Sequence, residues 1–131
     1  MDDDSFVDAF ESLTLPAKSF RHADHVRLAW IYLNRMPLPA AMARYAGRLQ
    51  AFAEHHGATD LYHETITFAF VLIINDRLSS DPPETTWSEF QQRNPDIFQG
   101  AKHTLGRYYT EERLASSQAR AHFLMPDRLA G

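Results

Sequence analysis

DLYHETITFAFVLIINDRL, residues 60–78, is the stretch that decides the fold class of the chain. Its seven consecutive apolar residues, Phe68 to Ile74, are compatible with a buried strand or with a buried helix. The run lies within about 19 residues that contain no proline or glycine, which is too long for a typical strand. We therefore predict a helix from a cap at Thr59 or Asp60 to Leu78, apolar nearly all round, as the most buried helix of the fold.

Proline and glycine punctuate the sequence on both sides of this helix. Apolar residues recur at helical spacing between these breaks, and Thr86 with Glu89 forms a capping-box pattern. The predicted helices cover residues 5–15, 20–36, 39–56 and 86–98, with weaker helical signals at 102–108 and 116–125. We predict an all-α fold, a compact bundle of four to five main helices with up-down connections, in a single domain over residues 1–131.

The composition narrows the classes of function. Hydrophobic residues make up 44% of the chain and charged residues 23%, which is typical of a globular domain and excludes a disordered one. The absence of cysteine excludes disulfides, thiolate metal sites and cysteine nucleophiles. The net charge of −4, from 13 basic and 17 acidic residues, predicts no nucleic-acid partner, because binding a phosphate backbone needs a clustered basic surface.

The sequence also predicts no membrane partner. Its longest apolar stretch has seven residues, far fewer than the roughly 20 that span a bilayer. The chain starts Met-Asp-Asp-Asp, which is acidic where a signal peptide is basic. We expect a cytoplasmic protein.

Histidines are the most informative residues of the chain. His22 and His25 lie three residues apart near the start of the second predicted helix, so they share a face. His63 and Glu64 lie in the first turn of the fourth. Short connections make consecutive helices antiparallel, so the second and fourth helices start at the same end and bring these four residues into one layer. The same topology brings three weaker candidates to that end, namely His55, His56 and His103.

A metal site is the chemistry that this arrangement favours. His22, His25 and His63 could supply three nitrogens to a divalent transition metal such as zinc, iron or copper, with a position left open for catalysis. Glu64 could be a further ligand or a general base acting on metal-bound water, although adjacent helical residues point about 100° apart. His103 could be a ligand or an acid. We therefore predict a metal-dependent enzyme acting on a small organic molecule.

Two other classes of function remain open. One is a metal-free binding or assembly module in which the histidines make structural hydrogen bonds at helix ends, the ordinary role of a histidine at a helix start. The other is a metal-free isomerase or lyase that uses a His–Glu pair for acid–base catalysis. The sequence is also compatible with a homodimer.

Two segments of the sequence are similar to segments of a protein family. Residues 20–30, FRHADHVRLAW, and residues 62–67, YHETIT, resemble segments of a small all-helical bacterial protein family with F-x-H-x-x-H-V and Y-H-E-T-I-T motifs. Residues 107–109, RYY, are similar to a further segment of that family. The resemblance covers most of the chain, and because no activity is attached to that family, it implies no mechanism.

Overall fold

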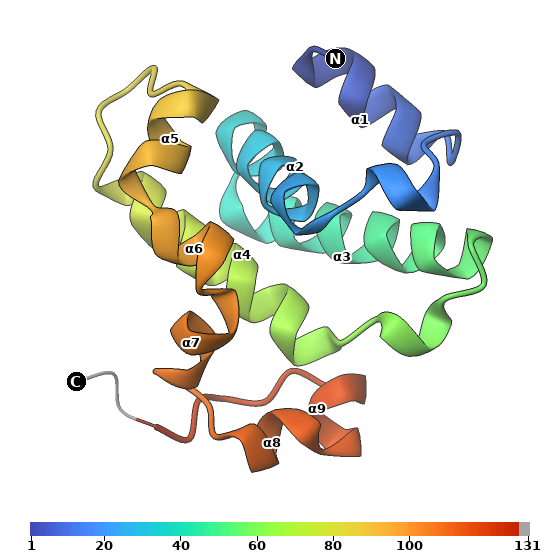
Figure 1. Cartoon of the computed structure of the whole chain (residues 1–131), viewed down its shortest axis with the longest axis vertical. Helices are drawn as coiled ribbons and strands as arrows, with labels where there is room; N and C mark the ends of the chain where they lie inside the picture. Colours follow the sequence, from blue (N-terminus) through green and yellow to red (C-terminus); the bar gives the residue numbers. More distant parts are fainter. Residues whose placement is uncertain (129–131) are drawn as a thin grey trace. The chain divides into compact units, whose positions relative to one another are not determined.

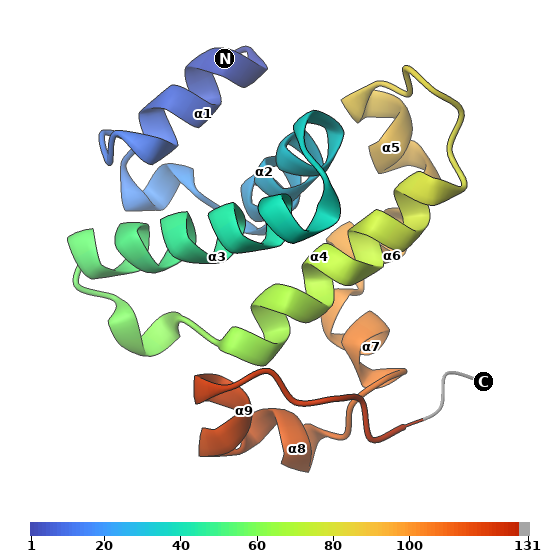
Figure 2. The ribbon, with the colours of Figure 1, turned by 180° about the vertical axis from the view of Figure 1, so that it is seen from behind.

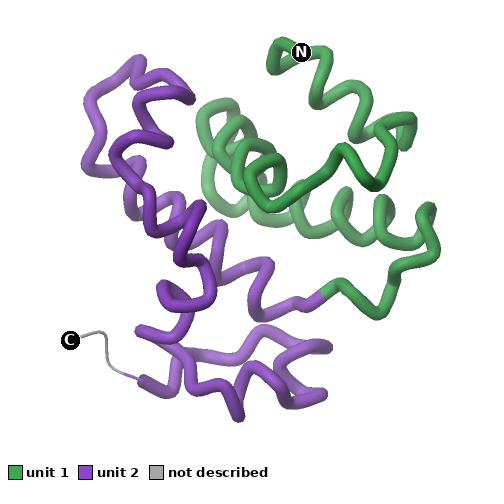
Figure 3. The backbone as a smooth tube through the Cα atoms, viewed as in Figure 1, with its two compact units in different colours: residues 1–62 green, residues 63–131 purple. Residues whose placement is uncertain are grey.

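The structure is a computed structural model that describes residues 1–128 (Figure 1). All regular secondary structure in these residues is helical, which confirms the all-α fold. The chain forms two compact units, residues 1–62 and a second unit that begins at His63 (Figure 3). None of the helices in the described part is long and apolar enough to cross a membrane.

The first unit is built from three helices and two short 3-10 turns. Asp2 begins the first helix by accepting a 2.8 Å hydrogen bond from the Ser5 amide, as a capping residue does. Pro37 starts the third helix with an extended backbone, and α2 and α3 pack against each other. The helices are α1 (Asp3–Glu11), α2 (His22–Arg35) and α3 (Leu38–His55), and the turns are Ala17–Ser19 and Thr59–Leu61.

Phenylalanine rings form the centre of the first unit. The ring of Phe10 lies 4.7 Å from that of Phe20 and 4.9 Å from that of Phe52, measured between centroids. All three side chains are buried. These contacts join α1, the segment before α2, and α3 into one aromatic core.

The second unit surrounds the stretch that decides the fold class. That stretch forms α4, so the helical interpretation is confirmed. Buried Ala69 packs with Leu105 and Tyr109 into a hydrophobic cluster that other half-buried side chains of the unit extend. The helices are α4 (Glu64–Ser79), α5 (Trp87–Arg93), α6 (Pro95–Gln99), α7 (Ala101–Gly106), α8 (Glu111–Ala115) and α9 (Ser117–Ala121).

The predicted helices differ from the observed ones most at four places. The first helix ends at Glu11 instead of Leu15, and Leu13 adopts a positive φ of 66°. The fourth helix begins at Glu64, because residues 59–61 form a separate 3-10 turn and His63 is extended. The fifth splits at Asn94, since a residue before proline avoids the helical conformation. The last helix ends at Ala121 instead of residue 125, because His122 has an extended backbone with φ −135° and ψ 153°.

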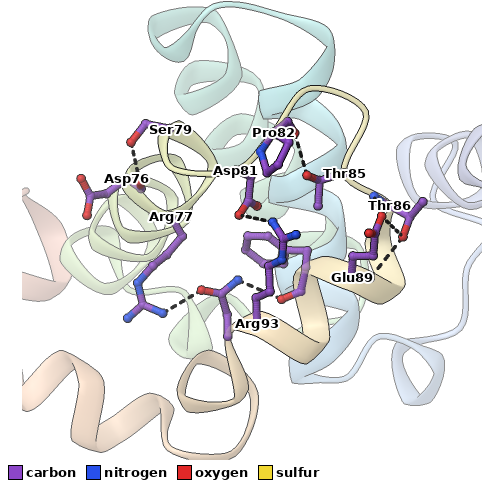
Figure 4. A network of polar contacts seen from close by, with 11 residues as sticks. Asp76, Arg77, Ser79, Asp81, Pro82, Thr85, Thr86, Glu89 and Arg93 are labelled. Atoms are coloured by element: carbon purple, nitrogen blue, oxygen red, sulfur yellow. Dashed lines mark hydrogen bonds and ion pairs between the residues drawn. The ribbon is translucent and has the colours of Figure 1, made fainter.

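A polar network fixes the far end of α4 to α5 and α6 (Figure 4). Arg77 donates a 2.9 Å hydrogen bond to the side chain of Asn94 and makes two more to Asp96. Arg93 pairs with Asp81 at 3.2 Å. These contacts hold the loop after α4 and require no ligand to explain them.

Candidate functional site

His22 and His25 lie one helical turn apart at the start of α2, as the sequence predicted. His22 is exposed, whereas His25 is partly buried with its ring stacked 4.0 Å from that of Phe20. Burial, together with the nearby charge of His22, lowers the pKa of His25 to about 4. The imidazole of His25 is therefore neutral at pH 7, the form in which a histidine binds a metal or accepts a proton.

His56 belongs to the same aromatic region of the first unit. Its ring lies 4.4 Å from the ring of Phe52, and its Nε2 lies 3.2 Å from the carbonyl oxygen of Leu15. A carbonyl only accepts hydrogen bonds, so Nε2 carries the proton and donates it. His56 thus ties the end of α3 to the segment that follows α1. Its neighbour His55 is exposed.

His63 caps α4, and both of its ring nitrogens are engaged within the second unit. Nδ1 accepts a hydrogen bond of 3.1 Å from the Ile66 amide, so it is unprotonated, and Nε2 donates to the Leu114 carbonyl at 2.7 Å. The ring is buried and connects the start of α4 to α8. The Thr67 hydroxyl donates to the His63 carbonyl at 2.7 Å, which secures the same turn.

The two predicted catalytic residues also lie in the second unit. Glu64 is the first residue of α4 and is half-buried. His103 lies on α7 with its side chain exposed. Within residues 1–128, no group of three or more histidine, aspartate or glutamate side chains is arranged to hold a metal ion. The meeting of His22 and His25 with His63 at one metal stays a prediction.

A second constellation, which the sequence analysis missed, holds residues 122–128. We call these residues the strap; they run back from the end of α9 past α8 (Figure 2). Four side chains hold the strap, and we call them the cradle. They are Thr65 of α4, Tyr109 and Thr110 of the segment before α8, and Arg113 of α8. Thr65 lies 57 positions from its partner His122, whereas the other cradle residues lie 12 to 17 positions from theirs. No periodic pattern links cradle and strap, so no local signal could have found this contact.

The comparisons with known proteins add no relative. No protein-family model, curated protein or solved structure matches the chain. The candidate sites therefore rest on the residues and contacts of this chain alone.

Proposed function

We propose that the chain is a metal-free binding or assembly module whose histidines have structural roles. The observation that carries this proposal is the engagement of both ring nitrogens of His63. Coordination of a metal through Nδ1 would remove the cap of α4, and coordination through Nε2 would remove the bond to the Leu114 carbonyl. Either loss would leave a polar main-chain group at a part-buried position without its partner.

The contacts of His56 and His25 support the same proposal. His56 donates to a main-chain carbonyl, and His25 packs face to face on a phenylalanine. Support for a binding role comes from the cradle, whose side chains hold a non-helical segment by its peptide groups. The proposal keeps the cytoplasmic location expected from the sequence.

Elemental analysis of protein purified without an affinity tag tests the proposal. We expect no stoichiometric metal, and no change in melting temperature when zinc, iron or copper is added. His63→Asn and His63→Ala form a matched pair, because asparagine can still cap a helix and alanine cannot. About one equivalent of metal in the native protein, lost in a folded His63→Asn variant, would overturn the proposal.

A metal-dependent enzyme acting on a small organic molecule is the second candidate. The observation that favours it is the neutral imidazole of His25, one turn from His22, because two histidines on one helix face can serve as neighbouring ligands. Further ligands would come from His63 or His103, with Glu64 as ligand or general base. His22→Ala should then abolish zinc-dependent stabilisation, while His55→Ala, which removes an exposed histidine elsewhere in the unit, should not.

A further inference from the structure

We infer that the cradle is a binding site for a non-helical peptide segment, that the strap is its resident occupant, and that the strap of a second copy of the chain can take its place. The inference rests on the proposed binding and assembly function and names the partner. It starts from the way in which the second unit holds residues 122–128.

The cradle binds the strap mainly by its peptide groups. The Thr65 hydroxyl donates to the His122 carbonyl at 2.7 Å and accepts from the Leu124 amide at 3.0 Å. The Tyr109 hydroxyl donates to the Leu124 carbonyl at 2.8 Å. Side chains from α4 and from the segment after α7 therefore hold one stretch of backbone from two directions.

Arg113 and Tyr108 extend the grip along the strap. Nε of Arg113 donates to the Met125 carbonyl at 2.8 Å, and the Arg128 amide donates to the Tyr108 carbonyl at 3.0 Å. Hydrogen bonds to peptide groups are available to any residue with the needed amide or carbonyl, so this grip tolerates different side chains.

Two of the strap's three large apolar side chains, Phe123 and Met125, contribute little to the hold, whereas Leu124 is half-buried. Phe123 is 37% exposed and Met125 is 69% exposed, although the backbone beside them is firmly bonded. Phe123 makes one edge-on ring contact, 6.1 Å from Phe68. Packing of these two side chains is thus not what places the strap in the cradle.

One side chain of the strap is recognised specifically. The Asp127 carboxylate accepts a 2.9 Å hydrogen bond from the Thr110 amide and a 2.7 Å bond from the Thr110 hydroxyl. Both bonds lower the pKa of Asp127, so it is ionised at neutral pH. The cradle therefore fits a non-helical segment with a carboxylate three residues after the residue that Thr65 and Tyr109 grip.

A second copy of the chain has the same sequence and therefore carries the same pattern. A strap exchanged between two copies would make the same hydrogen bonds as the strap within one copy. The free energy of exchange therefore comes mainly from the entropy lost when two chains join. The strap follows α9 directly, so on exchange its direction would change where the helix ends, at Ala121.

Titration of a fluorescently labelled peptide of residues 121–128 with the full chain tests the cradle. We expect half-saturation at about millimolar concentration, because the tethered strap competes at an effective concentration of that order. Asp127→Ala in the chain loosens its own strap and should tighten binding of the unaltered peptide about threefold. The same substitution in the peptide should weaken binding. A peptide that binds neither chain, or binds both equally, would overturn the inference.

Complementary variants test the second copy. Thr110→Val removes the cradle hydroxyl that donates to Asp127 and leaves the strap intact, whereas Asp127→Ala impairs the strap and leaves the cradle intact. Because both substitutions act on the same hydrogen bond, two such chains that exchange straps regain this bond in one of the two sites. In sedimentation experiments, a mixture of the two should contain more dimer than either alone. Equal amounts would overturn exchange between copies. Circular dichroism melts check folding, and Thr110→Ala replaces Thr110→Val if that variant unfolds. None of these measurements depends on metal content, so their failure is distinguishable from failure of the metal-free proposal.

Discussion

Nε2 of His63 lies 2.7 Å from the carbonyl oxygen of Leu114, a residue 51 positions further along the chain. The same ring caps its own helix through the Ile66 amide. A single neutral imidazole thus serves as a local cap and as a tertiary link at once. Such double use is possible because a neutral histidine offers one acceptor and one donor on opposite sides of the ring.

Replacement of His63 should show the two contributions separately. His63→Ala loses the cap and the link, and we expect it to lower the free energy of unfolding by about 2–4 kcal/mol. His63→Asn keeps a side-chain acceptor for the Ile66 amide, so its loss should be about 1 kcal/mol smaller. Urea denaturation measures both variants. Equal losses would show that the capping bond contributes nothing.

Much of the fold could be predicted from the sequence because the helices obey simple periodic rules. The run from Phe68 to Ile74 forms part of α4 as its length indicated, and Thr86 with Glu89 forms the predicted capping box. The start of α4 was missed because Thr59 and Asp60 have the composition of helix caps, whereas the observed cap is a histidine.

The candidate site was less predictable. The pattern correctly places His22 and His25 one turn apart, since that spacing depends only on helix geometry. It could not reveal that His63 bonds to the carbonyl of Leu114, because hydrogen bonds between distant segments leave no periodic trace. The same holds for Thr65 and the strap.

Stability should depend on pH through His25. The folded protein holds its pKa at about 4, below the ordinary value of 6.5, so the unfolded chain binds the proton more readily. The contribution is fully present above pH 6.5 and is lost as the pH falls toward 4, by at most about 3 kcal/mol. NMR titration of the imidazole should show a neutral ring at pH 5.

A His25→Gln variant provides the control for that titration. Glutamine has no titrating group in this range, so the difference in stability between the native protein and the variant should shrink as the pH falls from 6.5 to 4. A constant difference, or an imidazole that titrates near 6.5, would show that His25 is not held neutral by burial.

Glu11 should be the most sensitive charged residue of the first unit. Its carboxylate accepts hydrogen bonds from the Tyr32 hydroxyl and from Nε of Arg44, the latter at 2.7 Å, and joins all three helices. We expect Glu11→Ala to cost about 2 kcal/mol, because both donors lose their shared acceptor. Thermal or urea unfolding would measure the loss.

Arg48 offers a matched comparison for Glu11. Its guanidinium lies 4.0 Å from the same carboxylate and is 43% exposed. An exposed pair at that distance contributes little, so Arg48→Ala should change stability by no more than about 0.5 kcal/mol. A loss equal to that of Glu11→Ala would mean that charge alone, and not the hydrogen-bonded geometry, stabilises this junction.

Hydrogen exchange at the Leu124 amide should report directly on the hold of the strap. This amide donates to the buried Thr65 hydroxyl at 3.0 Å, and valine has the shape of threonine without that acceptor. Thr65→Val should therefore speed exchange at Leu124 by about tenfold. Thr67→Val removes another buried hydroxyl, which bonds only to the carbonyl of the α4 cap, His63, and should leave Leu124 exchange unchanged. If both variants accelerate exchange alike, general destabilisation is responsible, and the cradle does not hold the strap through Thr65.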